Sequence, residues 1–309
     1  MNVKQFKTID EQIAILRSKG LIINNEDLAK DLLLRENYFF ITGYRHPFLK
    51  SPKDKTFIEG TTFEELYALF FFDRHFRNVI FQNLLIVENN IKSIMSYQIS
   101  KKYGHRERDY LREENFATDY RRSRQVKDIL QKMKRQVRIN GRKHSATIHY
   151  LNTYGYIPLW VLVKVLSFGL VSELFTILKD SDRIEISNGY KINADTLGIY
   201  LSILSNYRNL CAHEDILYEN RTEKFIEDTR FHAELKIPVD EEGYIFGKDD
   251  MFSVIVILKQ MLSTRDFKNM MRTITDELTR LDNRVNIIPI EKILARMGFP
   301  INYADIMEL

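Results

Sequence analysis

The stretch TFEELYALFFF, residues 62–72, opens the longest helical pattern in the sequence. Thr62 and Glu65 have the spacing of a capping box, in which each side chain accepts a hydrogen bond from the other's backbone N–H at a helix start. The pattern continues to about Tyr103, where Gly104 supplies a stop. Apolar residues lie on most faces, so we expect a central, buried helix. They include Leu66, Leu69, Phe70, Phe76, Ile80, Leu84, Val87, Ile91 and Met95.

Outward from this segment, the composition predicts an all-α fold. Only 12 Gly and 6 Pro interrupt 309 residues, and 44% hydrophobic with 28% charged residues is a normal globular balance. We expect an aromatic loop over 37–48, a short hairpin within 237–248, and Trp160 in the core. Further helical patterns cover about 8–19, 26–35, 120–143, 193–213, 250–281 and 290–297, and another begins near Pro158.

The single cysteine, Cys211, excludes an intramolecular disulfide framework and a cysteine-rich zinc site. Its apolar neighbours predict a buried, inert thiol. His144 and His149 have no nearby carboxylate, so we expect no metal site, and no phosphate loop or other cofactor motif is present. The most apolar stretches, 66–72 and 159–171, are too short or too interrupted to span a membrane, and no secretion signal is visible. We therefore expect a cytoplasmic protein without a membrane partner.

Charge is concentrated in one segment. The chain carries a net charge of +4, yet residues 120–143 contain ten Arg or Lys and one acid, Asp128, so the remainder of the chain is near −5. Such a run favours a polyanionic partner, RNA before a membrane, although a merely solvated helix has the same pattern. An aromatic group at 38–44 could stack on bases, but packing is favoured. The candidate RNA-binding residues are Arg121, Arg122, Arg124, Lys127, Lys134, Arg135 and Arg138.

The segment RNLCAH, residues 208–213, combines the residue types that RNA cleavage without a metal requires. Histidine can move protons near neutral pH, and the arginine fork can bind a phosphate. Asn209 and His213 are four apart and share a helix face, whereas Arg208 and His213 converge only if the helix ends there or Arg208 wraps around it. Because one chain supplies one such histidine, a symmetric dimer would complete the site. The alternative is an ordinary surface pair or helix cap.

This segment resembles the R-x4-H signature of HEPN-domain ribonucleases, with Asn209 in second place. The wider sequence, from residue 5 to about 221, resembles the Abi-like (abortive infection) family of bacterial HEPN proteins. The matching stretches are TIDEQI at 8–13 with Leu16, Gly20 and Leu21, Asn37-Tyr38, Gly43-Tyr44, Pro47-Phe48, VENNIK at 87–92, Tyr154-Gly155, PLW at 158–160 and SFG at 167–169.

The resemblance implies a HEPN-type helical bundle with additional N- and C-terminal helices. It implies a single helical unit, 1–309, comprising N-terminal helices and aromatic loop at 1–55, a core at 56–221 and a C-terminal extension at 222–309. It further implies a homodimer that cleaves RNA in antiphage, abortive-infection or toxin–antitoxin systems, without a metal or cofactor. The implied catalytic residues are Arg208, Asn209 and His213, supported by Glu88 and Lys92.

The sequence departs from the family at several places near the motif. Ile216-Leu217 stands where an Arg-Leu pair is expected, Lys92 stands where Arg is commoner, and the acidic pair Glu214-Asp215 follows the motif histidine where basic residues are frequent. Two acids there would weaken phosphate approach or raise the histidine pKa. A non-catalytic RNA-binding or phage-sensing module, with a structural motif, is therefore the alternative.

Overall fold

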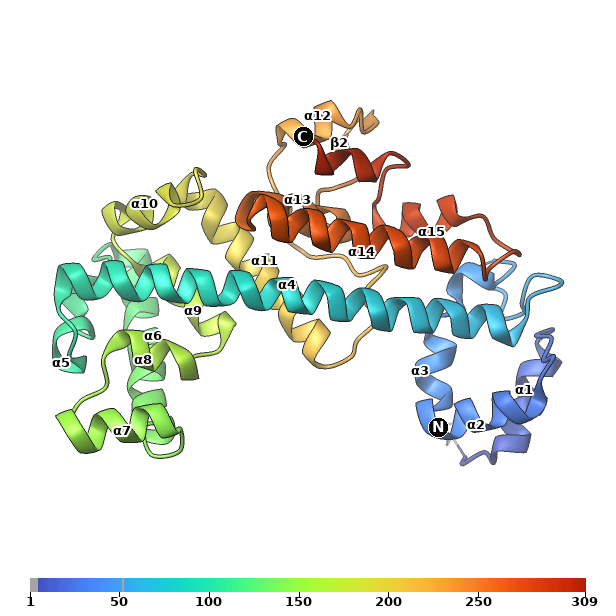
Figure 1. Cartoon of the computed structure of the whole chain (residues 1–309), viewed down its shortest axis with the longest axis horizontal. Helices are drawn as coiled ribbons and strands as arrows, with labels where there is room; N and C mark the ends of the chain where they lie inside the picture. Colours follow the sequence, from blue (N-terminus) through green and yellow to red (C-terminus); the bar gives the residue numbers. More distant parts are fainter. Residues whose placement is uncertain (1–4, 52) are drawn as a thin grey trace.

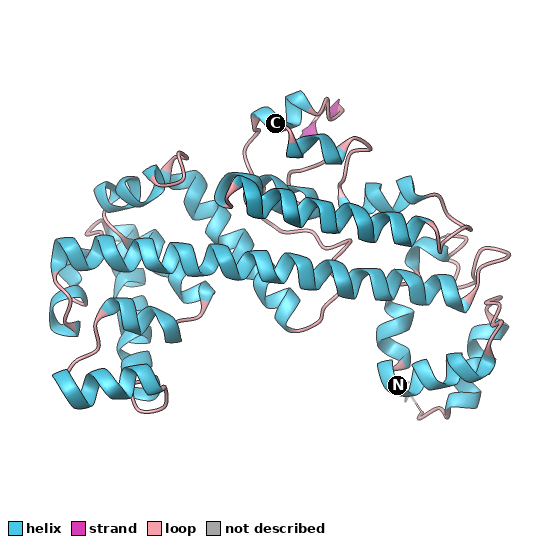
Figure 2. Cartoon of the chain, viewed as in Figure 1, coloured by secondary structure: helices cyan, strands magenta, loops and turns pink. Residues whose placement is uncertain are grey.

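The computed structural model describes residues 5–51 and 53–309, and it confirms an all-α fold. Helices account for nearly all regular structure in the described part of the chain (Figure 2). Its strands are the two-residue β1 (Val239–Asp240) and β2 (Gly243–Tyr244), which pair antiparallel and confirm the short hairpin.

Helix α4 (Phe63–Tyr103) is the axis of the molecule and runs along its longest dimension (Figure 1). Its 41 residues give a length of about 60 Å. The predicted capping box is present, because Thr62 accepts from the Glu65 N–H while Glu65 accepts from the Thr62 N–H. Gly104 ends the helix with a φ of +95°, which favours glycine. All nine apolar residues predicted to be buried in this helix are at most 5% exposed.

The other helices cover α4 at three places (Figure 1). Helices α11, α13 and α14 lie along its middle, where α14 runs beside α4 and α11 crosses it, while α9 and α10 lie toward the end that bears α5, and α12 lies beyond α13, away from α4. Helices α1 to α3 lie at one end and α5 to α8 at the other. The bounds are α1 (Ile9–Ser18), α2 (Glu26–Glu36), α3 (Tyr38–Gly43), α5 (Glu107–Tyr110), α6 (Tyr120–Asn140), α7 (Ser145–Tyr154), α8 (Leu159–Leu162), α9 (Phe168–Ile177), α10 (Asp180–Asn188), α11 (Ala194–Ala212), α12 (Arg230–Glu234), α13 (Met251–Met261), α14 (Thr264–Asp282) and α15 (Ile290–Met297), with 3-10 turns at His46–Phe48, Glu113–Asn115, Val163–Val165 and Tyr303–Met307.

Two local expectations were wrong. The segment 37–48 is not a loop, because α3 and a 3-10 turn occupy most of it. Asn37 permits the abrupt turn between α2 and α3, since it adopts a φ of +71° and its side chain accepts from the Phe39 N–H. The helical pattern at 250–281 is confirmed, and it divides into α13 and α14, with Ser263 as the cap of the second. Trp160 is 46% exposed and not part of the core, because the residues of a single helical turn point in different directions and Leu159, Val161 and Leu162 take the buried ones.

Within the described residues, no helix has a stretch both long and apolar enough to cross a lipid bilayer. The apolar surface is instead buried against other helices. Helix α13 shows this most clearly, because nine of its eleven residues are buried beneath neighbouring elements. The core therefore continues from α4 into the C-terminal helices, and it holds α11 firmly in place.

Candidate functional site

The 208–213 segment forms the end of α11, and the helix stops at the motif histidine. His213 is the C-cap residue, and its N–H donates to the Asn209 carbonyl. Beyond it, Asp215 N–H donates to Leu210 O at 3.2 Å and Glu214 N–H donates to Cys211 O at 3.4 Å, which is a Schellman arrangement. The side chains of Asn209 and His213 are both exposed, one turn apart at the helix end.

Glu214 occupies the position in this arrangement where glycine is usual. Its φ is +59°, a left-handed conformation that costs a side-chain-bearing residue about 1 kcal/mol or more. The chain accepts this conformation to end α11 at His213, rather than letting the helix continue. The turn therefore satisfies one of the two conditions under which Arg208 and His213 could approach, although no hydrogen bond or ion pair joins these two side chains.

Arg208 is tethered to α4 by one side of its guanidinium group. Its Nε lies 3.2 Å from Oε2 of Glu88, and its Cζ lies 5.8 Å from the centre of the Phe81 ring. The other carboxylate oxygen of Glu88 accepts from Lys92 at 2.6 Å. Glu88 and Lys92 are buried, whereas the Arg208 side chain is 30% exposed. The two Nη groups of Arg208 make no hydrogen bond to the described residues, so they remain able to donate to a phosphate.

A second polar group fixes the chain directly after the motif. Asp73 on α4 is completely buried, and it accepts from the Tyr44 hydroxyl at 2.6 Å, Arg77 at 2.9 Å, and the N–H groups of Leu217 and Tyr218 at 3.0 and 2.7 Å. Burial raises the pKa of Asp73, while these donors favour its ionised form.

Arg77 completes this group by donating to the Asp215 carbonyl at 2.9 Å. The contacts hold residues 215–218 against α4 and so fix where His213 emerges. Sequence reasoning missed Asp73 and Arg77. The available signal was an acid and a base four residues apart inside the apolar run FFFDRHFR at 70–77. Tyr44, one of the aromatic residues considered for base stacking, is buried here as packing predicts, whereas Phe39 and Phe40 of the same group are 75% and 55% exposed, so the packing prediction was wrong for them.

Cys211 lies in the 208–213 segment and is a free, buried thiol, as predicted. Burial raises its pKa to about 12. Because a thiolate is needed for nucleophilic attack, a thiol with so high a pKa is inert at neutral pH. The chemistry of this helix end therefore depends on the exposed residues that flank Cys211.

The acidic pair after the motif is exposed, but its two members differ in their surroundings. Glu36 is the main cause of the raised pKa of Arg74, and Glu214 adds a further electrostatic contribution. Glu214 thus lies within electrostatic reach of a cation on α4. Asp215 uses its carbonyl for Arg77, while its carboxylate is exposed to solvent. The negative charge of Glu214 therefore lies near the cation Arg74, whereas the carboxylate of Asp215 has no such neighbour among the described residues.

The basic helix α6 presents a cationic face to solvent, because Val126, Ile129, Leu130 and Met133 turn inward and are buried. The side chain of Arg121 lies outside the described residues. Exposed on the helix are the candidate residues Arg124, Lys127, Lys134, Arg135 and Arg138.

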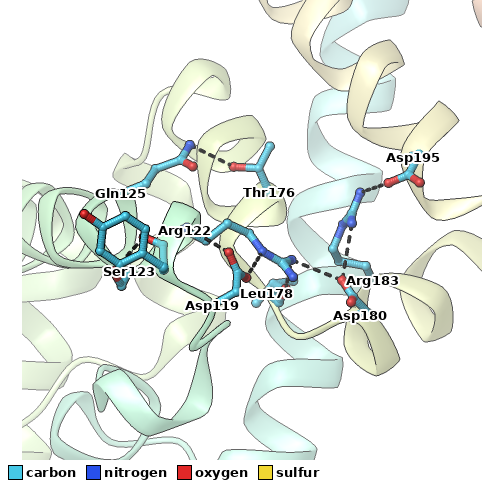
Figure 3. Close-up of polar contacts among 10 residues, drawn as sticks. Asp119, Arg122, Ser123, Gln125, Thr176, Leu178, Asp180, Arg183 and Asp195 are labelled. Carbon is cyan, nitrogen blue, oxygen red and sulfur yellow. Dashed lines mark hydrogen bonds and ion pairs between the residues drawn. The ribbon is translucent and has the colours of Figure 1, made fainter.

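Arg122 differs from these candidates because its guanidinium is occupied within the protein (Figure 3). It donates to Asp119 at 2.5 Å and to Asp180 at 3.1 Å, and these carboxylates raise its pKa. Arg183 joins the same group by donating to Asp180 at 3.5 Å, and it also donates to Asp195 at 2.7 Å. These ion pairs connect the start of α6 to α10 and α11, so Arg122 contributes to the position of the helix more than to an open surface.

Among residues 5–51 and 53–309, no three His, Cys, Asp or Glu side chains are grouped so that they could hold a metal ion. The charged groups that the structure does assemble are acid–base pairs, some within one helix and others between neighbouring segments.

Comparison with known proteins finds one family. A sequence model described as Abi-like protein matches residues 31–219, about three fifths of the chain. The match runs from α2 to just beyond the end of α11, so it contains both polar groups on α4 and the whole 208–213 segment. No protein of curated function and no solved structure shows significant similarity to the chain.

Proposed function

Because the chain belongs to the family of Abi-like proteins, we propose that it is a HEPN-type endoribonuclease that cleaves RNA without a metal, at a site shared by two copies of the chain. The family supports a role of the abortive-infection type. In that setting, a ribonuclease would act as an antiphage or toxin component. The observation that carries the proposal is the exposed pair Asn209 and His213 at the end of α11, beside a tethered Arg208.

Each residue has a defined task in this mechanism. His213 would take the proton from the 2′-hydroxyl or give one to the leaving 5′-oxygen. Arg208 would bind the scissile phosphate through its free Nη groups, because Glu88 holds only its Nε. Asn209, one turn before His213, would orient the phosphate or the imidazole. The products would be a 2′,3′-cyclic phosphate and a 5′-hydroxyl, since the 2′-oxygen itself attacks phosphorus.

Two copies are needed because acid and base work proceed on opposite sides of the phosphorus. Each chain supplies one His213, and the proposed dimer places two of them at one phosphate. The exposure of His213 and Asn209 leaves them accessible to a partner chain.

The test is cleavage of a mixed cellular RNA pool in EDTA by the wild-type protein, by His213→Ala and by His46→Ala. His46 is the matched control, because it is an exposed histidine outside the motif. We expect 2′,3′-cyclic phosphate ends from the wild type and from His46→Ala, and a loss of about a hundredfold or more in His213→Ala. Cleavage that persists unchanged in His213→Ala would contradict the proposal.

A second candidate is a non-catalytic RNA-binding or phage-sensing module. The observation that favours it is the acidic pair, because the exposed Asp215 carboxylate beside His213 would repel a phosphate. In this case Arg208 serves to hold α11 against α4 through Glu88. RNA binding without cleavage, equal in the wild type and in His213→Ala, is the result that would favour this candidate.

A further inference from the structure

Six aromatic rings follow one another across the end of the molecule built from α5, α7 and α8; we call them the aromatic row. Neighbouring ring centres lie 5.4–6.4 Å apart, which is the range of favourable ring contacts. The order along the row is Trp160, His105, Tyr156, Tyr154, Tyr150 and His149, with His149 touching both Tyr154 and Tyr150.

The aromatic row is a surface feature rather than part of the core. Tyr154 is 56% exposed and Trp160 is 46% exposed, and His105 and His149 are also exposed. Contiguous exposed aromatic surface is uncommon on a protein without a partner, since burying it would be favourable. The row therefore has aromatic surface available for a ligand.

At the Trp160 end, the aromatic row opens onto a shallow groove of about 460 Å³ between α4 and α8. Tyr97, which is 63% exposed, forms the opposite side of this groove, and Lys101 lies at its edge. Three serines of α4 add hydroxyl groups to the lining. Aromatic faces, hydroxyls and a cation in one groove suit a ligand that is flat in one part and anionic in another.

The charge around the aromatic row is positive. The Arg106 guanidinium lies 5.3 Å from the centre of the Tyr156 ring. Residues 141–165, which contain most of the row, include three cations (Arg142, Lys143 and Lys164) and no Asp or Glu. Of the carboxylates on the α5 side, Glu107 accepts from the Ile157 N–H at 2.5 Å and Asp109 lies 3.9 Å from Arg108 and Arg112, and Glu185 lies 3.8 Å from Lys101. A polyanion is therefore favoured to approach the rings from the α7 side, where no acid is present.

We propose that the aromatic row binds unpaired RNA nucleotides, whose bases stack on the rings while their phosphates contact the flanking cations. Stacking on aromatic side chains is how single-stranded nucleic acids are held without sequence preference, and duplex bases are not available for it. This inference rests on the proposed function for its ligand, and it deepens that function by assigning the substrate class. The row would hold a single-stranded region of the RNA that the 208–213 segment cleaves.

Trp160 makes a direct test possible, because it is the only tryptophan of the chain. The His213→Ala protein in EDTA keeps the RNA intact. A dye-labelled single strand of about 16 nucleotides, the upper end of the site size of a stacking domain, is titrated while anisotropy and Trp160 fluorescence are followed. We expect both signals to saturate at the same Kd, with quenching of Trp160. A duplex of the same sequence and inorganic polyphosphate should leave the fluorescence nearly unchanged.

Variants locate the effect. We expect Trp160→Ala and Tyr154→Ala each to weaken single-strand binding by roughly tenfold, and Tyr154→Phe to bind as before, because the phenylalanine ring still stacks. Phe225→Ala is the matched control, since Phe225 is 62% exposed and lies outside the row. Circular dichroism of each variant establishes that it is folded.

Three results would overturn the proposal. They are RNA binding without any change in Trp160 fluorescence, quenching by polyphosphate as strong as by RNA, and an unchanged Kd in Tyr154→Ala. No binding of single strands at all would also overturn it, and would favour a protein partner for the row. Cleavage by the wild type without quenching of Trp160 would reject the aromatic row as an RNA site but not the proposed ribonuclease activity. Quenching without cleavage by the wild type would reject the ribonuclease activity but not the RNA site.

Discussion

Helix α4 carries two acid–base pairs of the same sequence pattern that differ in what they leave free. Asp73 with Arg77 and Glu88 with Lys92 are each spaced by four residues, and each contacts the region where α11 ends. Asp73 accepts four hydrogen bonds, two of them from backbone groups. Glu88 instead binds one side of a partly exposed arginine, whose remaining donors face no described partner.

The first pair therefore stabilises the fold, whereas the second positions a functional side chain. Removing a buried charge with four donors should damage folding, whereas altering Arg208 should damage activity more than folding. Spacing alone cannot distinguish the two pairs, because both read as ordinary i, i+4 pairs. The distinction requires knowing which distant residue each pair contacts.

The largest effect is expected for Asp73→Ala. It leaves Arg77 buried without its carboxylate and removes the acceptor of the Leu217 and Tyr218 N–H groups, so we expect a loss of about 3–5 kcal/mol in the free energy of unfolding. Urea unfolding followed by circular dichroism measures it, with Asp73→Asn as a milder variant if the alanine protein does not fold.

The matched control is Asp31→Ala on α2, which breaks an exposed i, i+4 pair with Arg35. It should cost far less stability than Asp73→Ala, because exposed pairs contribute little. Equal losses in the free energy of unfolding for Asp73→Ala and Asp31→Ala would contradict the conclusion that the buried pair stabilises the fold.

The next effect is expected for Arg208→Lys. The lysine keeps the charge but loses the planar fork, so we expect kcat/KM for RNA cleavage to fall by roughly a hundredfold. Unfolding should change by less than about 1 kcal/mol, since the group makes one hydrogen bond and is partly exposed. A variant with full activity would show that the fork is not used on the phosphate.

A mixing experiment tests the shared site directly. Wild-type chains are mixed with an excess of His213→Ala chains, so that most wild-type chains enter mixed dimers with a single His213. Because the proposed site needs both histidines, we expect cleavage per wild-type chain to fall toward the level of His213→Ala. Verified mixed dimers that keep full activity per wild-type chain would argue against a site composed in this way.

The boundaries of α4 and α6 follow from local chemistry that a sequence displays directly. A capping box, a terminal glycine and the inward set Val126, Ile129, Leu130 and Met133 act within a few residues of one another. The same holds for the start of α11, where the side chain of the N-cap residue Asn193 accepts from the Thr196 N–H.

What could not be predicted depends on contacts between distant segments. The Asp73 contact to Leu217 spans 144 residues, and the Arg208 contact to Glu88 spans 120. The second was foreseen only through resemblance to a family, and the first not at all. Trp160 was misplaced for the same reason, because its exposure depends on where α8 ends and on which neighbours cover it.

A smaller effect is expected for Glu88→Gln, which keeps the shape of the side chain and removes its charge. Arg208 and the buried Lys92 then lack a counter-ion, so we expect a loss of about 1–3 kcal/mol in stability and a fall of roughly tenfold in activity. The double variant Glu88→Gln/Lys92→Met tests the comparison further. It should recover stability, because no buried ammonium remains unpaired, without recovering activity. Recovery of both would make Glu88 a purely structural residue.

The smallest effect separates Arg124 from Arg122 on α6, two arginines of which one is exposed and the other bound by Asp119 and Asp180 (Figure 3). We expect Arg124→Gln to weaken RNA binding about two- to fivefold and to reduce the slope of log Kd against log salt concentration by about 1, as loss of one phosphate contact would. Arg122→Gln should leave that slope unchanged and lower stability by up to about 1 kcal/mol, because its charge is already matched within the protein.

Since the two substitutions are identical and lie two residues apart, a difference between them can only come from what each guanidinium contacts. If both variants reduce the slope equally, the ion pairs around Arg122 open in solution and the whole start of α6 faces the RNA. If neither does, the cationic face of α6 is a solvated surface, and RNA binding has to be sought at the aromatic row and the end of α11.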